Sequence, residues 1–383
     1  MIQIIILGFV SFFVDVSTEM VYPLIPVFLT SALGASTAVL GLIEGLAESV
    51  ASLLKVFSGY ISDKLQKRKF LAIFGYGFSW LGKIFFVIAT TWQHVFTGRL
   101  LDRIGKGIRT APRDALIADY SDKSKRGYAY GIHRAMDTLG AFTGVVIVLF
   151  FVSKSNFDFH NAVLFKKIFL LSVIPAVIGW LLLFTIKERH ASSSNKKEIV
   201  FSWKKLPRRL KMFLVFTFIF ALGNSSNQFL LLKIQKETNS LVIVLTAYLI
   251  FNLVYAVMSI PCGKISDIIG QKSVLIAGYI VYGIVYWLFT ASTGSISYYI
   301  FSLGLYGFYM ALTEGVEKSL VSQLAPAELR ASMLGMHATL VGIGLLPASL
   351  IAGILWQKFG SAFTFGFGGS LGIIAATGLL FIL

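Results

Sequence analysis

The stretch Arg99–Asp119, RLLDRIGKGIRTAPRDALIAD, decides the fold, because it is too charged to face lipid yet lies between long apolar segments. On a helix, at about 100° per residue, its charged side chains fall within roughly 140° of arc, opposite an apolar face. Each Lys or Arg that faced lipid would cost about 2.5–3.5 kcal/mol. Such a helix can cross a membrane only if its charged face borders a polar interior. The charged residues are Arg99, Asp102, Arg103, Lys106, Arg109, Arg113 and Asp114.

The composition is that of a membrane protein. Of the 383 residues, 56% are hydrophobic and only 14% are charged, whereas roughly a quarter of the residues in a soluble chain are charged. Apolar runs of about 18 residues or more recur along the whole length, which is typical of membrane-spanning helices. The sequence therefore predicts an all-α, multi-pass membrane protein embedded in a lipid bilayer.

The positive charges are placed as membrane topology requires. The net charge is +16, but the basic residues cluster in short loops between apolar spans, as the positive-inside rule predicts. We therefore expect no nucleic-acid partner. The distribution of Lys and Arg among the loops places both termini in the cytoplasm. The expected location is the cell membrane, with a bacterial inner membrane as the favoured case.

Hydrophobic periodicity predicts twelve transmembrane helices. A polar linker, 187–211, is expected to separate an N-terminal six-helix bundle, 1–186, from a C-terminal one, 212–383. The expected spans are about 4–29, 38–60, 70–90, 99–119, 127–152, 163–186, 212–232, 240–262, 273–291, 297–323, 331–355 and 361–383.

The two halves repeat at a constant shift. Gly59-Tyr-Ile-Ser-Asp63 matches Gly263-Lys-Ile-Ser-Asp267, which begins 204 residues later. The same shift relates Arg126 to Arg330, Gly131 to Gly335 and His133 to His337. A repeat of this length predicts two pseudo-symmetric six-helix bundles, with a substrate site between them near the bilayer midplane.

Two motifs resemble those of the major facilitator superfamily. Gly59-x-x-x-Asp63-Lys64-x-x-Lys67-Arg68 is similar to that family's signature between helices 2 and 3, with Gln66 in place of a usual glycine, and a weaker copy contains Asp267. Arg99…Gly105-x-Gly107…Pro112 resembles the family's helix 4 motif. The resemblance implies a secondary transporter with alternating access. It also implies motif or gating roles for Gly59, Asp63, Lys64, Arg68, Arg99, Asp102 and Asp267. Alternatively, the basic residues of the loop only set topology.

Acidic residues within the spans are candidates for proton coupling. Asp15 and Glu19 share one face of their helix at i,i+4, and Glu44 and Glu48 do the same on the next helix. A carboxylate in a low-dielectric cavity can take up and release a proton near neutral pH. Alternatively, these acids only neutralise the cations of Arg99–Asp119, as a buried structural network.

The cations of the charged helix suggest an anionic substrate. Lys106, Arg109 and Arg113 form one stripe at i, i+3 and i+7, and the planar guanidinium group suits carboxylate or phosphate. Arg134 and Asn227 complete the predicted substrate-binding set. The opposing interpretation is that neighbouring acids neutralise the whole stripe.

The second half carries a candidate gate. Glu317 and Lys318 occupy the repeat-equivalent positions of Arg113 and Asp114 with the signs exchanged, and Glu314 lies one turn before Lys318. These pairs could face each other across the pathway and form ion pairs in one state of the transport cycle.

The sequence contains no P-loop, no metal-ligand spacing and no nucleophile motif, so we expect neither an enzyme nor a cofactor or metal site. The predicted function is proton-coupled secondary transport of a small organic solute by a monomer. The solute is expected to be anionic, for example a carboxylate-type metal chelate or siderophore. The alternative is drug or metabolite efflux by proton antiport, because Gly131, Gly140 and Gly144 partly match the antiporter spacing of the superfamily.

Overall fold

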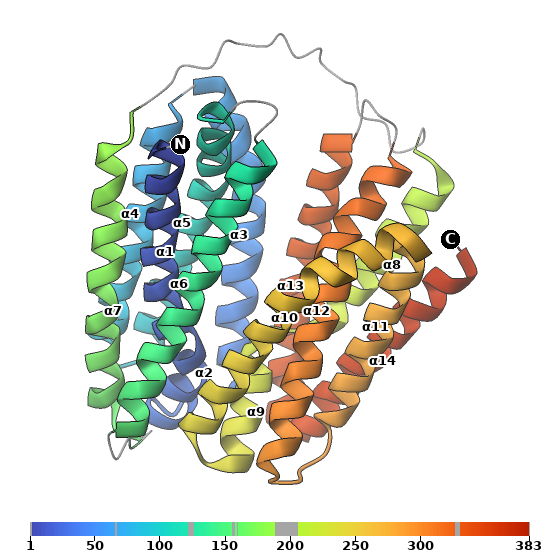
Figure 1. Cartoon of the computed structure of the whole chain (residues 1–383). Helices are drawn as coiled ribbons and strands as arrows, with labels where there is room; N and C mark the ends of the chain where they lie inside the picture. Colours follow the sequence, from blue (N-terminus) through green and yellow to red (C-terminus); the bar gives the residue numbers. More distant parts are fainter. Residues whose placement is uncertain are drawn as a thin grey trace. The chain divides into compact units, whose positions relative to one another are not determined.

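The computed structural model describes residues 2–65, 67–121, 126–154, 158, 160–187, 206–325 and 330–382. Within these ranges all regular secondary structure is helical, and the long helices of each half run alongside one another (Figure 1). In chain order the elements are α1 (Ile2–Val21), η1 (Tyr22–Leu24), α2 (Ile25–Val27), η2 (Phe28–Ala32), α3 (Thr37–Leu65), α4 (Arg68–Val87), α5 (Trp92–Asp119), α6 (Arg126–Lys154), α7 (Ala162–Leu182), η4 (Leu183–Thr185), α8 (Arg208–Gly223), α9 (Gln228–Thr238), α10 (Leu241–Ile269), α11 (Gln271–Leu288), α12 (Ile296–Leu324), α13 (Arg330–Phe359) and α14 (Ser361–Ile382).

The expected number of membrane-crossing segments is confirmed. Among the described residues, ten helices or helix runs are long and apolar enough to cross a membrane. The other two long helices are α5 and α12, which interrupt their apolar sequence with charged residues and are 28 and 29 residues long. A span needs about 20 residues, so both are long enough to cross, and together with the ten they make an all-α fold of twelve transmembrane helices.

Two compact units make up the chain, Met1–Ser194 and Asn195–Leu383. In the first unit, α5 packs on α3 and α4, while α1 packs on α6 and α7. In the second unit, α12 packs on α10 and α11, while α8 packs on α13 and α14. These are repeat-equivalent contacts, which confirms two pseudo-symmetric six-helix bundles. Of the predicted linker, residues 188–205 lie outside the described ranges, and residues 208–211 already belong to α8.

The first span of each unit is interrupted at the same place. α1 ends at Val21 and is followed by short turns that contain Pro23 and Pro26, which cannot donate a backbone hydrogen bond. In the second unit α8 ends at Gly223, and α9 begins at Gln228. Each of these spans is expected from its sequence to be a single helix, and the two interruptions correct that expectation.

Glycines set the distance between α4 and α5. A Cβ on Gly82 would lie 2.5 Å from the carbonyl oxygen of Gly98, and a Cβ on Gly75 would lie 2.7 Å from that of Gly105. The two helices therefore touch backbone to backbone at two levels, as small residues allow inside membranes. This contact fixes the register of α5 and thus the position of its charged face.

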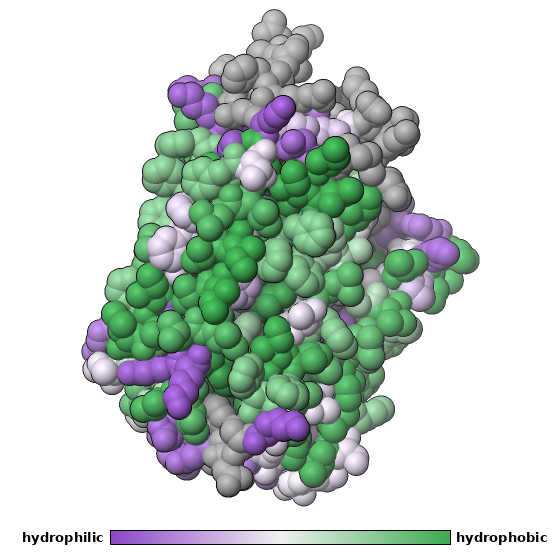
Figure 2. All heavy atoms as spheres, turned by 60° about the vertical axis from the view of Figure 1, so that its left-hand side comes forward, coloured by the Kyte–Doolittle hydropathy of each residue, from purple (hydrophilic) through white to green (hydrophobic). Residues whose placement is uncertain are grey.

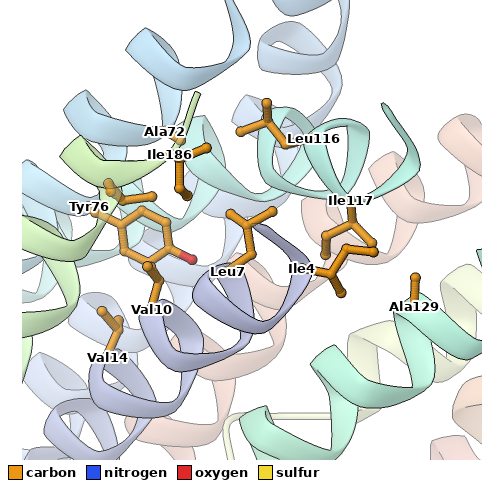
Figure 3. Close-up of a cluster of buried hydrophobic side chains, with 11 residues drawn as sticks. Ile4, Leu7, Val10, Val14, Ala72, Tyr76, Leu116, Ile117, Ala129 and Ile186 are labelled. Carbon is orange, nitrogen blue, oxygen red and sulfur yellow. The ribbon is translucent and has the colours of Figure 1, made fainter. Parts of the chain in front are cut away.

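Apolar residues close one end of the first unit. Ile4, Leu7 and Val10 of α1 pack with Tyr76 of α4 and Leu116 of α5 in a buried cluster (Figure 3). On the molecular face seen in Figure 2, hydrophobic side chains gather across the middle and hydrophilic ones lie mostly near the two ends. An apolar belt between polar ends is the surface that a bilayer requires.

The α4–α5 contact generates a stability prediction. Gly105→Ala should lower the free energy of unfolding by about 1–3 kcal/mol, because its Cβ would run into the backbone of α4. Thermal unfolding in detergent measures the effect. Gly131→Ala is the matched control, since a Cβ there has no heavy atom within 4 Å, and it should leave stability unchanged or raise it by up to about 1 kcal/mol. Equal stability of the two variants would contradict the backbone contact.

Candidate functional site

A buried ion-pair network centred on Arg99 joins α5 to α3. Its guanidinium donates from Nε to Glu44 Oε1 at 2.7 Å and from NH2 to Glu44 Oε2 at 2.8 Å. A third bond, of 3.3 Å, reaches Glu48. Arg99 is 1% exposed and Glu44 is 0% exposed, so the pair is sealed from solvent. The guanidinium also lies 5.1 Å from the ring centroid of Tyr22, where the first span is interrupted.

The network extends one turn further along α5. Arg103 lies 3.3 Å from Glu48 and 3.5 Å from Asp102, and Asp102 is also 3.8 Å from Arg99. Glu44, Glu48 and Asp102 therefore face fixed guanidinium groups. This geometry corresponds to the alternative in which these acids neutralise the charged helix, and it leaves Glu44 and Glu48 poorly placed to exchange protons with a cavity.

The three cations of the predicted stripe have different environments. Arg109 is buried, stacks 4.4 Å from the ring centroid of Tyr76 and donates a hydrogen bond to Ser79. Arg113 is bound to its neighbour Asp114, with two bonds of 3.0 and 2.9 Å to Oδ1. Lys106 is half-buried and forms no ion pair with any residue that the structure describes. Among the described residues, it is the cation of the stripe whose side chain has neither an ion pair nor a hydrogen bond.

Asp15 meets a second carboxylate, Asp137 of α6. The two side chains are within hydrogen-bonding distance of each other. Two ionised carboxylates offer no donor, so a hydrogen bond between them requires one shared proton. The exposed fraction of the Asp137 side chain is 20%, and Asp15 is also half-buried, so the pair retains access to solvent.

Glycines of α6 bring the two carboxyl groups together. A Cβ on Gly140 would lie 2.9 Å from the Cα of Phe12, and one on Gly144 would lie 3.1 Å from Glu19 Cβ. Both glycines therefore allow α6 to lie against the backbone of α1, on either side of Asp15. Packing against α1 accounts for the glycine spacing that partly matches the antiporter motif. A Cβ on Gly131 would have no such neighbour.

Fixed cations surround the carboxyl pair. Arg109 and Lys106 of α5 interact electrostatically with Asp15. Arg113 and Arg134 do the same with Asp137. The structure thus gathers the preferred coupling residue and the predicted substrate cations in one place within the first unit. Glu19 lies one turn from Asp15 on the same helix and is half-buried.

Of the remaining substrate candidates, Arg134 lies at the exposed edge of this cluster and Asn227 lies outside it. Arg134 is largely exposed, with 62% of its side chain accessible, and lies 3.5 Å from Asp137. Asn227 belongs to the second unit, at the N-cap of α9, and its Oδ1 accepts a 2.7 Å hydrogen bond from Tyr306.

Tyrosines satisfy the other polar groups of the interruption between α8 and α9. Tyr282 donates to the carbonyl oxygen of Gly223 at 2.7 Å, and Tyr286 lies 3.3 Å from the Ser225 hydroxyl. The Asn224 amide donates to Tyr309 at 3.3 Å. Asn227, with its bond from Tyr306, is therefore one of several polar groups of this interruption that tyrosines hold in place. Any role of Asn227 in substrate binding remains a prediction.

The residues of the loop motif and of its weaker copy lie at or near the ends of their helices. Arg68 forms an ion pair with Asp119 and donates to the carbonyl oxygen of Ala115 at 3.4 Å, so it ties the start of α4 to the end of α5. Lys64 and Asp267 are exposed. The side chain of Asp63 lies outside the described residues. The gating role of these residues stays a prediction.

Gly59 of the loop motif does not mark a close helix contact. A Cβ there would make only an ordinary contact, 3.5 Å from Ala111 Cβ. The tight approach between α3 and α5 is at Gly107, where a Cβ would lie 2.6 Å from Leu54 Cβ. Close packing of α3 on α5 therefore belongs to the helix 4 motif.

The gate candidates have partners inside the second unit. Glu314 accepts a hydrogen bond from Tyr255, and Lys318 lies 3.7 Å from Glu314. Glu317 accepts a 2.9 Å hydrogen bond from Tyr279 and lies 3.4 Å from His337 Nε2. The pairing of Arg113 with Glu317 stays a prediction.

Sequence reasoning did not include Asp137 among the candidate site residues. Because Asp137 lies three residues after Arg134, the sequence suggests only an ion pair within one helix. The signal that could have revealed it is Gly140, which lies one turn later and marks the face of α6 that approaches a neighbour.

Comparisons with known proteins agree with this architecture. The profile of the Major Facilitator Superfamily matches residues 7–232 and 213–383. An uncharacterised MFS-type transporter of Methanocaldococcus jannaschii is 40% identical, over 98% of this chain and 94% of its own. The multidrug resistance protein MdtH of Blochmanniella pennsylvanica is 27% identical over 48% of this chain and 44% of its own.

A solved structure shares the fold. The nucleoside transporter NupG superposes with a TM-score of 0.80 over 99% of this chain and 98% of its own, at 14% identity. The family profile covers nearly all of the sequence, and the relative from Methanocaldococcus jannaschii matches 98% of it. The chain belongs to the Major Facilitator Superfamily of membrane transporters.

Proposed function

We propose that the protein is a proton-coupled secondary transporter that moves a small organic anion across the cytoplasmic membrane. The observation that carries this proposal is the Asp15–Asp137 carboxyl pair beside Lys106 and Arg109. A site that combines a shared proton with fixed cations has the two components that proton-coupled anion transport needs. Both termini are proposed to lie in the cytoplasm, and the working unit to be a monomer.

The charges of this site determine whether proton binding strengthens or weakens the binding of an anion. When the carboxyl pair is ionised, its negative charge competes with a substrate for Lys106 and Arg109. When it is protonated, the pair no longer offsets these cations, although Glu48 still acts on Lys106, and they attract an anion more strongly. Proton binding and anion binding therefore favour each other, as transport of both in the same direction would require.

The supporting argument for the substrate class rests on Lys106. Arg99 and Arg103 are held by acids, and Arg113 by Asp114. Lys106, three residues before Arg109 on α5, is then the cation that can attract a negative group. A carboxylate-rich metal chelate or siderophore is one class that would use several cations at once.

Alternatively, the protein expels a drug or metabolite in exchange for protons, and its similarity to MdtH favours this function. A cationic substrate would compete with the proton for Asp15 and Asp137, so the two would be carried in opposite directions. Loss of Lys106 should leave such binding intact. The first of the two following experiments separates the two functions.

A ligand-stabilisation screen of the purified protein tests the substrate class. Citrate, its iron(III) chelate and related carboxylates should raise the melting temperature, and lipophilic cations should not. Lys106→Gln should weaken binding of a positive compound by about 10- to 100-fold, the loss expected for one charge-assisted hydrogen bond. Lys154→Gln, at the exposed end of α6, is the matched control and should bind normally. Stabilisation by cations alone, unaffected by Lys106→Gln, would establish the alternative.

Proteoliposomes test the coupling. With an anion from that screen, Asp15→Asn and Asp137→Asn should each abolish accumulation driven by a pH gradient while preserving exchange of labelled for unlabelled substrate. The reason is that each substitution removes a titrating carboxyl group but leaves the cations. Asp158→Asn, in an exposed turn, should retain both activities. Gradient-driven accumulation by Asp15→Asn would show that the proton is carried elsewhere.

A further inference from the structure

Two buried histidines occupy repeat-equivalent positions in the two units. His133 lies on α6 and His337 on α13, 204 residues apart, and each is 5% exposed. Their positions in the fold match because α6 packs on α1 as α13 packs on α8. Any difference in their chemistry must come from the side chains around them.

The charged groups beside the two imidazoles differ. His133 Nε2 lies 2.7 Å from the hydroxyl of Ser11, which is itself 3.5 Å from the guanidinium of Arg113. Arg134 and the carboxylates of Asp137 and Asp114 also act on His133, so its surroundings are of mixed charge. The repeat-equivalent residue of Arg113 is Glu317, and its Oε2 lies 3.4 Å from His337 Nε2. The second histidine thus directly faces a carboxylate, whereas the first faces a hydroxyl with a fixed cation beyond it.

The surroundings of His337 hold the two groups in place. Tyr279 donates a 2.9 Å hydrogen bond to Glu317 Oε1, which leaves Oε2 directed at the imidazole. Phe213 of α8 stacks on the imidazole, with ring centroids 6.0 Å apart and an interplanar angle of 5°. Nε2 is buried and makes no hydrogen bond to any residue that the structure describes.

No other described charge competes for this imidazole at close range. On α12, Glu314 is bound by Tyr255, and Lys318 is 63% exposed and pairs with Glu314. On α8 the residue facing it is Phe213, whereas Arg208, Arg209 and Lys211 belong to the first turn of that helix. The sequence of α14 contains no titratable side chain, and α11 contributes Tyr279 through Glu317.

We propose that His337 and Glu317 form a second proton-binding site, located in the C-terminal unit. Binding adds one proton to the neutral imidazole, and the resulting imidazolium donates from Nε2 to Glu317 Oε2. The proton satisfies a buried nitrogen and converts an ion–neutral contact into an ion pair. Because Glu317 is on α12 and His337 on α13, protonation ties these helices together. The site does not depend on Asp15, Asp137 or the nature of the substrate.

Histidine side-chain NMR of the full-length protein in detergent tests this proposal. The chain has five histidines, and His133→Gln and His337→Gln assign the two signals that matter. At pH 6 the protonated fraction of His337 should exceed that of His133. Glu317→Gln should reduce the protonated fraction of His337 by about threefold and leave His133 unchanged. Glu314→Gln, one turn earlier on the same helix, is the matched control and should change neither.

Equal protonated fractions of His133 and His337 in the unmodified protein would overturn the proposal. An unchanged His337 signal in Glu317→Gln would also overturn it. The comparison between the two histidines needs no variant at position 317, so it decides the matter even if that variant does not fold.

Discussion

The bidentate ion pair between Arg99 and Glu44 is the interaction on which the first unit depends. Both side chains are sealed inside the bundle, and removing one partner of a buried pair costs about 3–5 kcal/mol. The pair makes it possible for a helix as charged as α5 to cross a membrane. It also links three elements, since Arg99 of α5 binds α3 and lies over Tyr22 where the first span is interrupted.

The second unit has no charge at two of the equivalent positions. Position 248, the repeat equivalent of Glu44, is a tyrosine, and position 306, the equivalent of Asp102, is another. Tyrosines of α11 and α12 supply the hydroxyl groups that satisfy the interrupted span between α8 and α9. Two units of one fold therefore differ in chemistry. The first concentrates fixed charge, and the second provides a hydroxyl-rich interior with one carboxylate–histidine contact.

Much of this architecture could be predicted from the sequence. Hydropathy predicted the twelve spans, and the constant shift of 204 residues predicted the two bundles. The pairing of charges could not be predicted, because acids and bases within the spans of the N-terminal half nearly balance and any of several pairings would neutralise them. Backbone contacts decide among these pairings. The Gly75–Gly105 contact fixes the register of α5, and Gly140 brings Asp137 to Asp15.

The interruptions were missed for a related reason. Proline marks the first one, whereas the second contains no proline and is stabilised by tyrosines that lie far away in the sequence. Hydrophobic periodicity depends on local sequence alone, so it predicts one continuous helix for each of these spans.

In the first unit, the acids that neutralise the arginines of α5, with Glu44 sealed from solvent, are distinct from the proposed proton-binding pair of Asp15 and Asp137. Infrared spectroscopy of the carbonyl stretch of protonated carboxyl groups tests it most directly. At neutral pH the account predicts one such group in the N-terminal unit, whose band disappears in Asp15→Asn and persists in Glu44→Gln. A band that survives Asp15→Asn and disappears in Glu44→Gln would contradict it.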